Sequence, residues 1–368
     1  MRCISLVTGL NINAKKCNLL GIGVSETDVA SMAKFLNCKE GSLPFEYLGI
    51  PIGSNMKRAC NWNPVIDRFA KKLATWKAKS LSFAGRVTLA KSVLGSLPSY
   101  YLSLFKAPVG VLKKLEKIRR DFVWGKSGES HKMRWVRWDK LTRAKDKGGL
   151  GIGRIRDFNV AMIVKWWWRM REDPDHLWAK VVSSIHGSRL NKKLIPVNNS
   201  IPGVWKDIGS VDEILRKTGI GIADKLKVTV GNGAKTRFWK DVWLSQTALC
   251  DEFPDIFRLA KNKEVSVAEC FAGHNSNRRW AWEWVRDPES KVEWLHTGSL
   301  MIRLQQACLS EAQDRWKFEN SEGTNFSVKD LRKILADRET DQDNDRPFMW
   351  NNWATLKANF LAWRATLM

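Results

Sequence analysis

The chain of 368 residues carries 62 Lys and Arg against 38 Asp and Glu, which gives a formal net charge of +24. This length predicts two or three domains and is sufficient for a sizeable hydrophobic core. No charge-free apolar run of about twenty residues occurs, so we expect neither a membrane-spanning helix nor a membrane partner.

Cysteine usage and the start of the chain give further limits. Seven cysteines are scattered without a CxxC pair, and the five histidines show no ligand spacing with them. This pattern predicts reduced thiols and no metal site. The apolar stretch in residues 1–9 is too short for a secretory signal. We therefore expect an intracellular protein.

The positive charge is concentrated in the middle of the chain. Residues 51–240 carry 40 Lys and Arg against 14 Asp and Glu, whereas residues 241–368 carry 17 against 20. A localised excess of this kind favours a polyanionic partner, and nucleic acid is the one we expect. The alternative is a solvated face that only promotes solubility.

The first 53 residues predict a small α/β segment. Short strands are expected before residue 25, Ser25 is a typical N-cap for a helix to Leu36, and residues 44–53 form an apolar strand and turn. A chain that starts within a sheet suggests a truncated domain. We expect this segment to be poorly ordered without its missing sheet partners.

Three amphipathic helices are predicted within residues 54–125. They start near Asn63-Pro64, at Ser82 and at Pro108, and each combines an apolar stripe with a basic back. Packing of the stripes against one another leaves a positive surface. The basic side chains expected on that surface are Lys71, Lys72, Lys79, Arg86, Lys91, Lys113, Lys117 and Arg120. For any single lysine, a solvated charge is the alternative.

Residues 126–200 predict a basic helical connection, with one helix from Asp157 to Arg171. Arg134 and Arg137 alternate with Trp135 and Trp138, so these tryptophans are candidates for base stacking and these arginines for phosphate contact. The other tryptophans at periodic or hairpin positions are expected in the core. They are Trp76, Trp168, Trp239, Trp243 and Trp316.

Residues 201–368 predict a Trp-rich α+β region. Alternating residues on both sides of Gly231-Asn232-Gly233 indicate a β-hairpin, and residues 339–346 are acidic and expected to be disordered. The whole chain is therefore predicted to be mainly helical and of the α+β class. The expected domains are residues 1–53, 54–125, 126–200 and 201–368.

Eight short motifs occur in one order along almost the whole chain. They are Gly9–Asn13 with Lys16, Tyr47–Pro51, Leu81–Arg86 with Leu97-Pro98, Phe122–Trp124, Lys147–Gly151, Phe238–Trp243, Phe326–Lys329 and Phe360–Arg364. In this order they resemble the reverse transcriptase of plant non-LTR retrotransposons, the LINE-type elements. The likeness covers the end of the palm, the thumb and the connection that leads to the zinc-binding domain.

The resemblance implies a fragment of an RNA-directed DNA polymerase, and nuclear localisation. In that family the catalytic aspartates lie in a palm upstream of residue 1, and a Cys/His zinc-binding segment lies beyond residue 368. The chain contains no Tyr-x-Asp-Asp sequence. We therefore expect no catalytic residue and no cofactor in this chain, although Mg would serve the full-length polymerase.

The resemblance also implies roles for individual residues. Lys16 matches a lysine near the leaving phosphates, and Tyr47, Leu48 and Gly49 match the segment that holds the primer end. The basic helices match a thumb that holds RNA, an RNA/DNA hybrid or DNA by its phosphates. No small-molecule substrate is expected. Two alternatives remain: a non-enzymatic host RNA/DNA-binding protein derived from such an element, and a Trp-rich binder of glycans or proteins.

Overall fold

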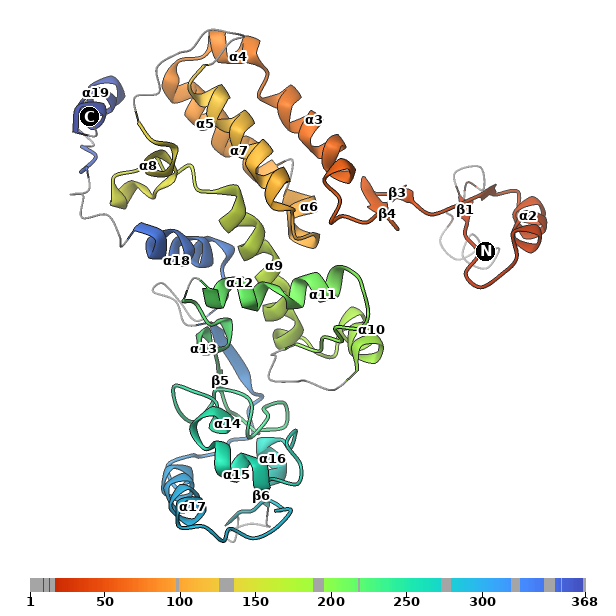
Figure 1. Cartoon of the computed structure of the whole chain (residues 1–368), viewed down its shortest axis with the longest axis vertical. Helices are drawn as coiled ribbons and strands as arrows, with labels where there is room; N and C mark the ends of the chain where they lie inside the picture. The colour runs from red at the N-terminus through yellow and green to blue at the C-terminus, as the bar shows by residue number, and fades with distance from the viewer. Residues whose placement is uncertain are drawn as a thin grey trace. The chain divides into compact units, whose positions relative to one another are not determined.

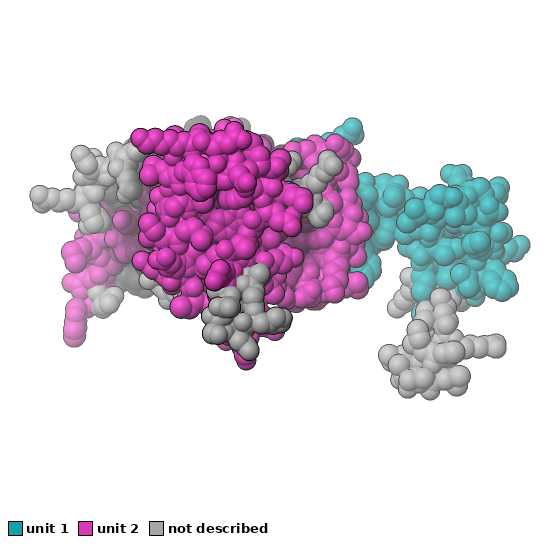
Figure 2. Space-filling view, turned by 90° about the horizontal axis from the view of Figure 1, so that it is seen from below, with its two compact units in different colours: residues 1–63 teal, residues 64–368 magenta. Residues whose placement is uncertain are grey.

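The computed structural model is mainly helical with a few short strands, so the predicted α+β class is confirmed (Figure 1). The chain divides into two compact units, residues 1–63 and residues 64–368, which Figure 2 distinguishes by colour. The domain boundaries expected at residues 53, 125 and 200 stay predictions. The structure describes residues 9, 13, 17–96, 99–125, 136–187, 195–217, 219–272, 279–318, 325–340, 348–351 and 353–366.

The first unit holds one helix and two small strand pairs. Its elements are β1 (Asn18–Leu19), α2 (Glu26–Phe35), β2 (Lys39–Glu40), β3 (Phe45–Tyr47), β4 (Ile50–Ile52) and η2 (Ala59–Trp62). β1 and β2 pair in parallel, as expected for strands joined by a helical crossover, whereas β3 and β4 are antiparallel. The predicted helix after Ser25 is confirmed, because the Ser25 hydroxyl accepts a hydrogen bond from the Asp28 amide at 3.2 Å.

The basic stretch around residues 63–123 folds into five helices where three were predicted. They are α3 (Asn63–Lys72), α4 (Thr75–Ser80), α5 (Phe83–Ser96), α6 (Ser99–Leu104) and α7 (Val109–Val123). The first predicted helix is interrupted because Ala74 adopts an extended conformation. In the second unit, α5 packs against α6 and α7, and α4 also packs against α7. Leu115 and Phe122 of α7 are buried, as its apolar stripe predicts.

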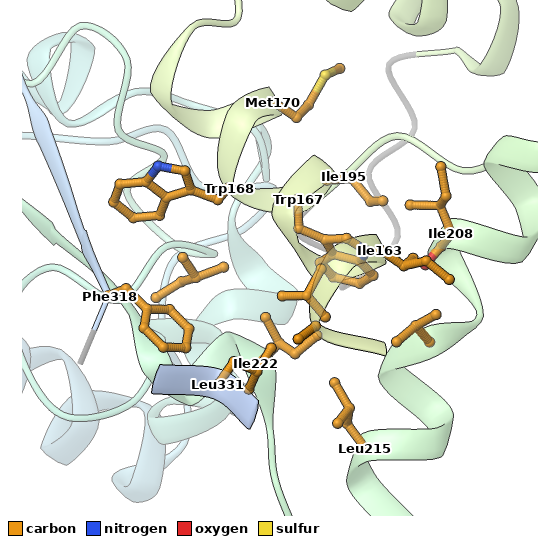
Figure 3. Packing of buried hydrophobic residues seen from close by; sticks show 14 of the residues in the cluster. Ile163, Trp167, Trp168, Met170, Ile195, Ile208, Leu215, Ile222, Phe318 and Leu331 are labelled. Carbon is orange, nitrogen blue, oxygen red and sulfur yellow. Dashed lines mark hydrogen bonds between the residues drawn. The ribbon is translucent and has the colours of Figure 1, made fainter. Parts of the chain in front are cut away.

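Helix α9 (Ile155–Glu172) is the central element of the second unit. It packs against α6, α7 and α18 (Val328–Thr340) and begins two residues before the predicted start at Asp157. The neighbouring elements are α8 (Trp138–Thr142), η3 (Lys145–Lys147), α10 (Leu177–His186), α11 (Val204–Gly209), α12 (Val211–Lys217) and α13 (Ile222–Lys225). Figure 3 shows the core around Trp167, whose indole N–H donates to the Ile208 carbonyl at 3.1 Å.

The hairpin predicted around Gly231–Gly233 is wrong. Strand β5 (Leu226–Thr229) pairs antiparallel with β8 (Arg315–Phe318), so its partner lies far along the chain. The Asp314 carboxylate holds the turn, because it accepts hydrogen bonds from the amides of Gly231 and Gly233, both at 2.8 Å. A Cβ on Gly231 would lie 2.1 Å from the Ala312 carbonyl oxygen, which only glycine avoids.

The tryptophans mostly serve the core, as predicted. Trp168, Trp239 and Trp316 are buried, and Trp243 packs against a second aromatic cluster around Phe238. The side chain of Trp76 and the residues 341–347 lie outside the described part. The remaining elements are α14 (Leu249–Glu252), α15 (Pro254–Leu259), α16 (Val267–Cys270), β6 (Phe271–Ala272), β7 (Arg279–Trp280), α17 (Lys291–Leu304) and α19 (Leu356–Thr366).

Candidate nucleic-acid interface

Arg86 was expected to contact phosphate, which stays a prediction, and the structure shows its guanidinium bound to backbone carbonyls. Its Nε donates to the Val123 carbonyl at 2.8 Å, and its Nη1 donates to the carbonyls of Ala78 and Leu81 at 3.0 and 3.1 Å. These carbonyls lie at the C-terminal ends of α4 and α7, where helices leave acceptors unsatisfied. Arg86 therefore ties two helix ends together, and burial lowers the pKa of its guanidinium.

Replacing Arg86 with methionine is expected to lower the free energy of unfolding by about 2–3 kcal/mol, because the buried carbonyls lose a charged donor. The measurement is urea denaturation followed by circular dichroism. Arg86→Lys is the control, and it should recover only part of the loss because one ammonium cannot reach all three carbonyls. An Arg86→Met variant of unchanged stability and weaker RNA binding would support the phosphate role instead.

The other predicted basic residues fall into separate groups. Lys71, Lys72 and Lys79 are exposed on α3 and α4, whereas Lys91 is half-buried on α5. Arg137 is exposed but forms an ion pair with Asp139 at 2.8 Å. Lys16, Arg134 and Trp135 lie outside the described residues.

Tyr47 ends β3, and Leu48 and Gly49 form the turn of the β3–β4 hairpin in the first unit. Tyr47 is 62% exposed and Leu48 74% exposed, so the turn presents apolar side chains to solvent. Leu48 and Gly49 have φ values of 51° and 79°, and a branched side chain is rare in this region. The two-residue turn with positive φ at both positions matches the right-handed twist of the strands. Its proposed role at a primer end stays a prediction.

Three predicted residues, Lys113, Lys117 and Arg120, converge on one cleft. They project from α7 at spacings of three and four residues, which places them on one face of the helix. The cleft has a volume of about 1010 Å³ and lies between α7, α8 and the first turns of α9. We call it the α7–α9 cleft. It is lined by Lys106, Ala107, Val109, Leu112, Lys113, Glu116, Lys117, Arg120, Trp138, Asp139, Arg154, Arg156, Asn159, Val160 and Ile214.

The charge of the α7–α9 cleft is strongly positive. Six of its lining residues are Lys or Arg, and only Glu116 and Asp139 are acidic. Both oxygens of Glu116 are engaged, since Oε1 accepts from the Ile155 amide at 2.7 Å and Oε2 from the Trp138 indole at 3.0 Å. Asp139 is paired with Arg137. The lining of the cleft therefore keeps an excess of positive charge, six basic residues against two acidic ones.

Lys113 and Lys117 are exposed at the cleft, whereas Arg120 is half-buried. The Nε of Arg120 is buried without a hydrogen-bond partner in the described part of the chain, which costs free energy. Apolar side chains such as Leu112, Val160 and Ile214 line the cleft together with the cations. The arrangement fits an anionic ligand with an apolar or aromatic part.

Sequence reasoning missed three of the six cations, Lys106, Arg154 and Arg156. Lys106 lies just before α7, and its ammonium contacts the Ser210 hydroxyl at 2.9 Å. Arg154 and Arg156 lie at the start of α9, in the pattern Gly-Arg-Ile-Arg. Basic residues at a helix start are unusual, because they oppose the helix dipole. That pattern was the available signal for a functional role.

The described residues contain neither a candidate metal centre nor a candidate membrane span. Among the residues that the structure describes, no group of three His, Cys, Asp or Glu side chains is placed to hold a metal ion. Within the same ranges, no helix combines the length and the apolar character needed to cross a membrane. The geometry of the cleft supports binding of an anion by charge and contact.

Two plant proteins are similar to this chain, and no protein-family model matches it. "Putative ribonuclease H protein At1g65750" of Arabidopsis thaliana is 28% identical over 303 residues, which cover 78% of this chain and 45% of that protein. "Uncharacterized mitochondrial protein AtMg00310" of the same plant is 29% identical over 150 residues, or 40% of this chain and 93% of that protein. The chain therefore spans less than half the length of the first relative.

Proposed function

We propose that this chain is part of a retroelement-derived RNA-directed DNA polymerase, of the LINE-type reverse transcriptases, and that it binds RNA or an RNA/DNA hybrid in the α7–α9 cleft. The observation that carries the proposal is the convergence of six basic side chains on that cleft, with both of its carboxylates already engaged. The relative whose name contains ribonuclease H, a nuclease, supports a nucleic-acid partner.

Phosphate contacts explain how such a cleft would work. Lys113, Lys117 and Arg120 can each approach a different backbone phosphate, because phosphates repeat along a strand and these side chains repeat along α7. Such contacts set the position of the strand without reading its sequence. A-form duplexes and single strands both offer this backbone, and the apolar lining of the cleft provides room for sugar or base faces.

We propose that polymerisation itself needs residues beyond this chain. Magnesium would supply activation of the primer hydroxyl and stabilisation of the leaving pyrophosphate in the full polymerase. The described acids near the cleft do not fit that role, because Glu116 caps the start of α9 and Asp139 pairs with Arg137. The contribution of this chain is therefore to hold the template and primer.

Fluorescence anisotropy of a labelled RNA/DNA hybrid tests the proposal. If about five phosphates are engaged, the logarithm of the binding constant should fall with the logarithm of the salt concentration with a slope of about −4 to −5. A primer-extension assay with magnesium should show no synthesis by this chain alone. Binding that does not respond to salt would contradict the first part, and measurable synthesis would contradict the second.

A non-enzymatic host RNA/DNA-binding protein is the second candidate. The observation that favours it is the second relative, which contains little besides the segment that it shares with this chain. A short protein of this kind would bind nucleic acid without polymerising it, provided that the shared segment contains the α7–α9 cleft. Binding to RNA or hybrid is expected in both cases, whereas only the polymerase fragment should support extension when a palm-containing polypeptide is added in trans.

A further inference from the structure

A second basic cavity lies between the start of α9, the residues just before it and α18. It has a volume of about 360 Å³, within the range of about 300–1,000 Å³ that is typical of small-molecule sites. We call it the α18 cavity. It is lined by Thr142, Arg143, Ala144, Lys145, Asp146, Gly151, Gly153, Arg154, Asp157, Lys329, Arg332, Lys333 and Ala336. Arg154 is the residue that it shares with the α7–α9 cleft.

The wall formed by residues 142–153 is a tight, internally bonded turn. The amides of Gly149 and Gly151 donate to the carbonyls of Ala144 and Arg143 at 2.9 and 2.7 Å. A Cβ on Gly149 would lie 2.2 Å from the Arg143 carbonyl oxygen, so this close approach requires glycine. The turn therefore holds Lys145 in a fixed place at the edge of the cavity.

Two lysines from distant parts of the chain meet at this turn. The Lys91 ammonium nitrogen lies 3.7 Å from the position that a Cβ on Gly151 would occupy, and Lys145 Cγ lies at the same distance from it. Burial lowers the pKa of Lys91, and the charge of Lys145 lowers that pKa further. Within the described ranges, neither lysine forms an ion pair with an acidic side chain. Two adjacent cations without a counter-charge repel each other, and a bound anion would relieve this repulsion.

Basic residues outnumber acidic residues in the lining of the α18 cavity. Six lining residues are Lys or Arg, against Asp146 and Asp157. Asp146 is exposed, and Asp157 is buried at the base of α9. Burial raises the pKa of the Asp157 carboxyl. The positive charges of Arg154, Arg156 and Arg332 lower this pKa and so offset part of the increase. The Arg332 guanidinium lies 5.3 Å from the centre of the Phe158 ring and is half-buried, and this burial lowers its pKa.

We propose that the α18 cavity is a binding site for a phosphate group, held between Lys145 and Arg332, with the Lys91 ammonium beside Gly151 at the edge of the cavity. The phosphate would come either from a free anion such as inorganic phosphate or a nucleotide, or from the phosphodiester backbone of a bound strand. Charge-assisted hydrogen bonds from several Lys and Arg side chains are the usual means of holding this group. The site is separate from the cations of α7, so the inference does not depend on the proposed function.

Two single substitutions in the full chain test the site. Lys145→Gln removes a charge from the cavity wall, and Lys147→Gln removes the same charge two residues away, from an exposed side chain that does not line the cavity. Each protein is titrated by calorimetry with inorganic phosphate, with adenosine 5′-monophosphate and with an RNA oligonucleotide that lacks terminal phosphates. Circular dichroism confirms that both variants are folded.

We expect the Lys145→Gln variant to bind at least one of these ligands about 5–10-fold more weakly than the Lys147→Gln variant. A loss of this size is expected when one charged hydrogen bond is removed. A loss for phosphate or the monophosphate identifies a free anion as the ligand. A loss confined to RNA, with a salt slope reduced by about 1, identifies a phosphodiester. The Lys91→Gln variant should also bind the same ligand more weakly than the wild-type chain.

Equal binding by the Lys145→Gln and Lys147→Gln variants in all three titrations would overturn the inference, as would a wild-type chain that binds none of the ligands. Failure of the proposed function has a different signature, because it leaves RNA binding unaffected by substitutions at Lys113, Lys117 and Arg120. The titrations with phosphate and the monophosphate are independent of that result.

Discussion

Replacing Asp241 with asparagine should lower the free energy of unfolding by about 3–5 kcal/mol, the usual cost of removing one partner from a buried ion pair. Asp241 is fully buried, and its carboxylate accepts hydrogen bonds from the Arg237 amide at 2.8 Å and from Arg237 Nε at 3.1 Å. Arg171 Nη2 lies 3.7 Å from the same carboxylate. One buried carboxylate therefore balances two arginines.

The charges in this group explain the size of the effect. Burial lowers the pKa of Arg171 to about 10, so its guanidinium is still charged at neutral pH. Burial alone would raise the pKa of Asp241, but the charges of Arg171 and Arg237 and the hydrogen bonds from Arg237 outweigh it and lower that pKa. An asparagine keeps the shape and loses the charge, which leaves Glu264, 3.7 Å from Arg237 Nη1, as the acidic partner that remains for the two arginines.

The dependence on pH gives this prediction a second measurement. Because the pKa of Asp241 is lower in the folded chain, its contribution is complete above the unfolded value of about 3.9. The contribution is lost as the pH falls from there through the folded pKa. The difference in unfolding free energy between wild type and Asp241→Asn should therefore be constant near neutral pH and shrink in acid.

Asp251→Asn is the matched control for Asp241→Asn. Asp251 is exposed in the same region of the chain, so the same chemical change there should alter stability by less than about 0.5 kcal/mol. Urea denaturation at neutral pH measures both variants. Equal stabilities of the two variants would show that the Asp241 network does not support the fold.

Local patterns predicted the helices well but not their interruptions. Ser25 and Pro108 marked helix starts correctly, because caps and fixed φ angles act within a few residues. The break at Ala74 and the pairing of β5 with β8 depend on contacts across the fold, which local propensity does not contain. The sequence correctly indicated a tight turn at Gly231. The amides of this turn donate to the Asp314 carboxylate, however, and the turn does not join two neighbouring strands.

The candidate site shows the same limit at the level of single side chains. Helical spacing correctly placed Lys113 and Lys117 on one exposed face of α7. The same reasoning could not separate them from Arg86, because a basic side chain at a helix start has the same pattern whether it faces water or neighbouring carbonyls. Only the packing of α5 against α7 decides that Arg86 is a structural residue.

A variant in which Lys113, Lys117 and Arg120 are all replaced by alanine should bind an RNA/DNA hybrid about 100-fold more weakly near 0.15 M salt. Each phosphate contact releases counterions worth about 0.7 logarithmic units in affinity at that concentration, so three contacts give about two. For the same reason the salt slope should become less steep by about 3. Anisotropy titrations over a range of salt concentrations measure both quantities.

The control for this triple variant removes the same net charge elsewhere. Lys180, Lys263 and Lys291 are exposed and do not line the α7–α9 cleft, so their replacement by alanine tests the effect of total charge alone. If binding followed only long-range attraction, both triple variants would weaken it equally, and the cleft would lose its role. If the cleft holds the strand, the control should keep nearly the full salt slope, because the contacts that release counterions are intact.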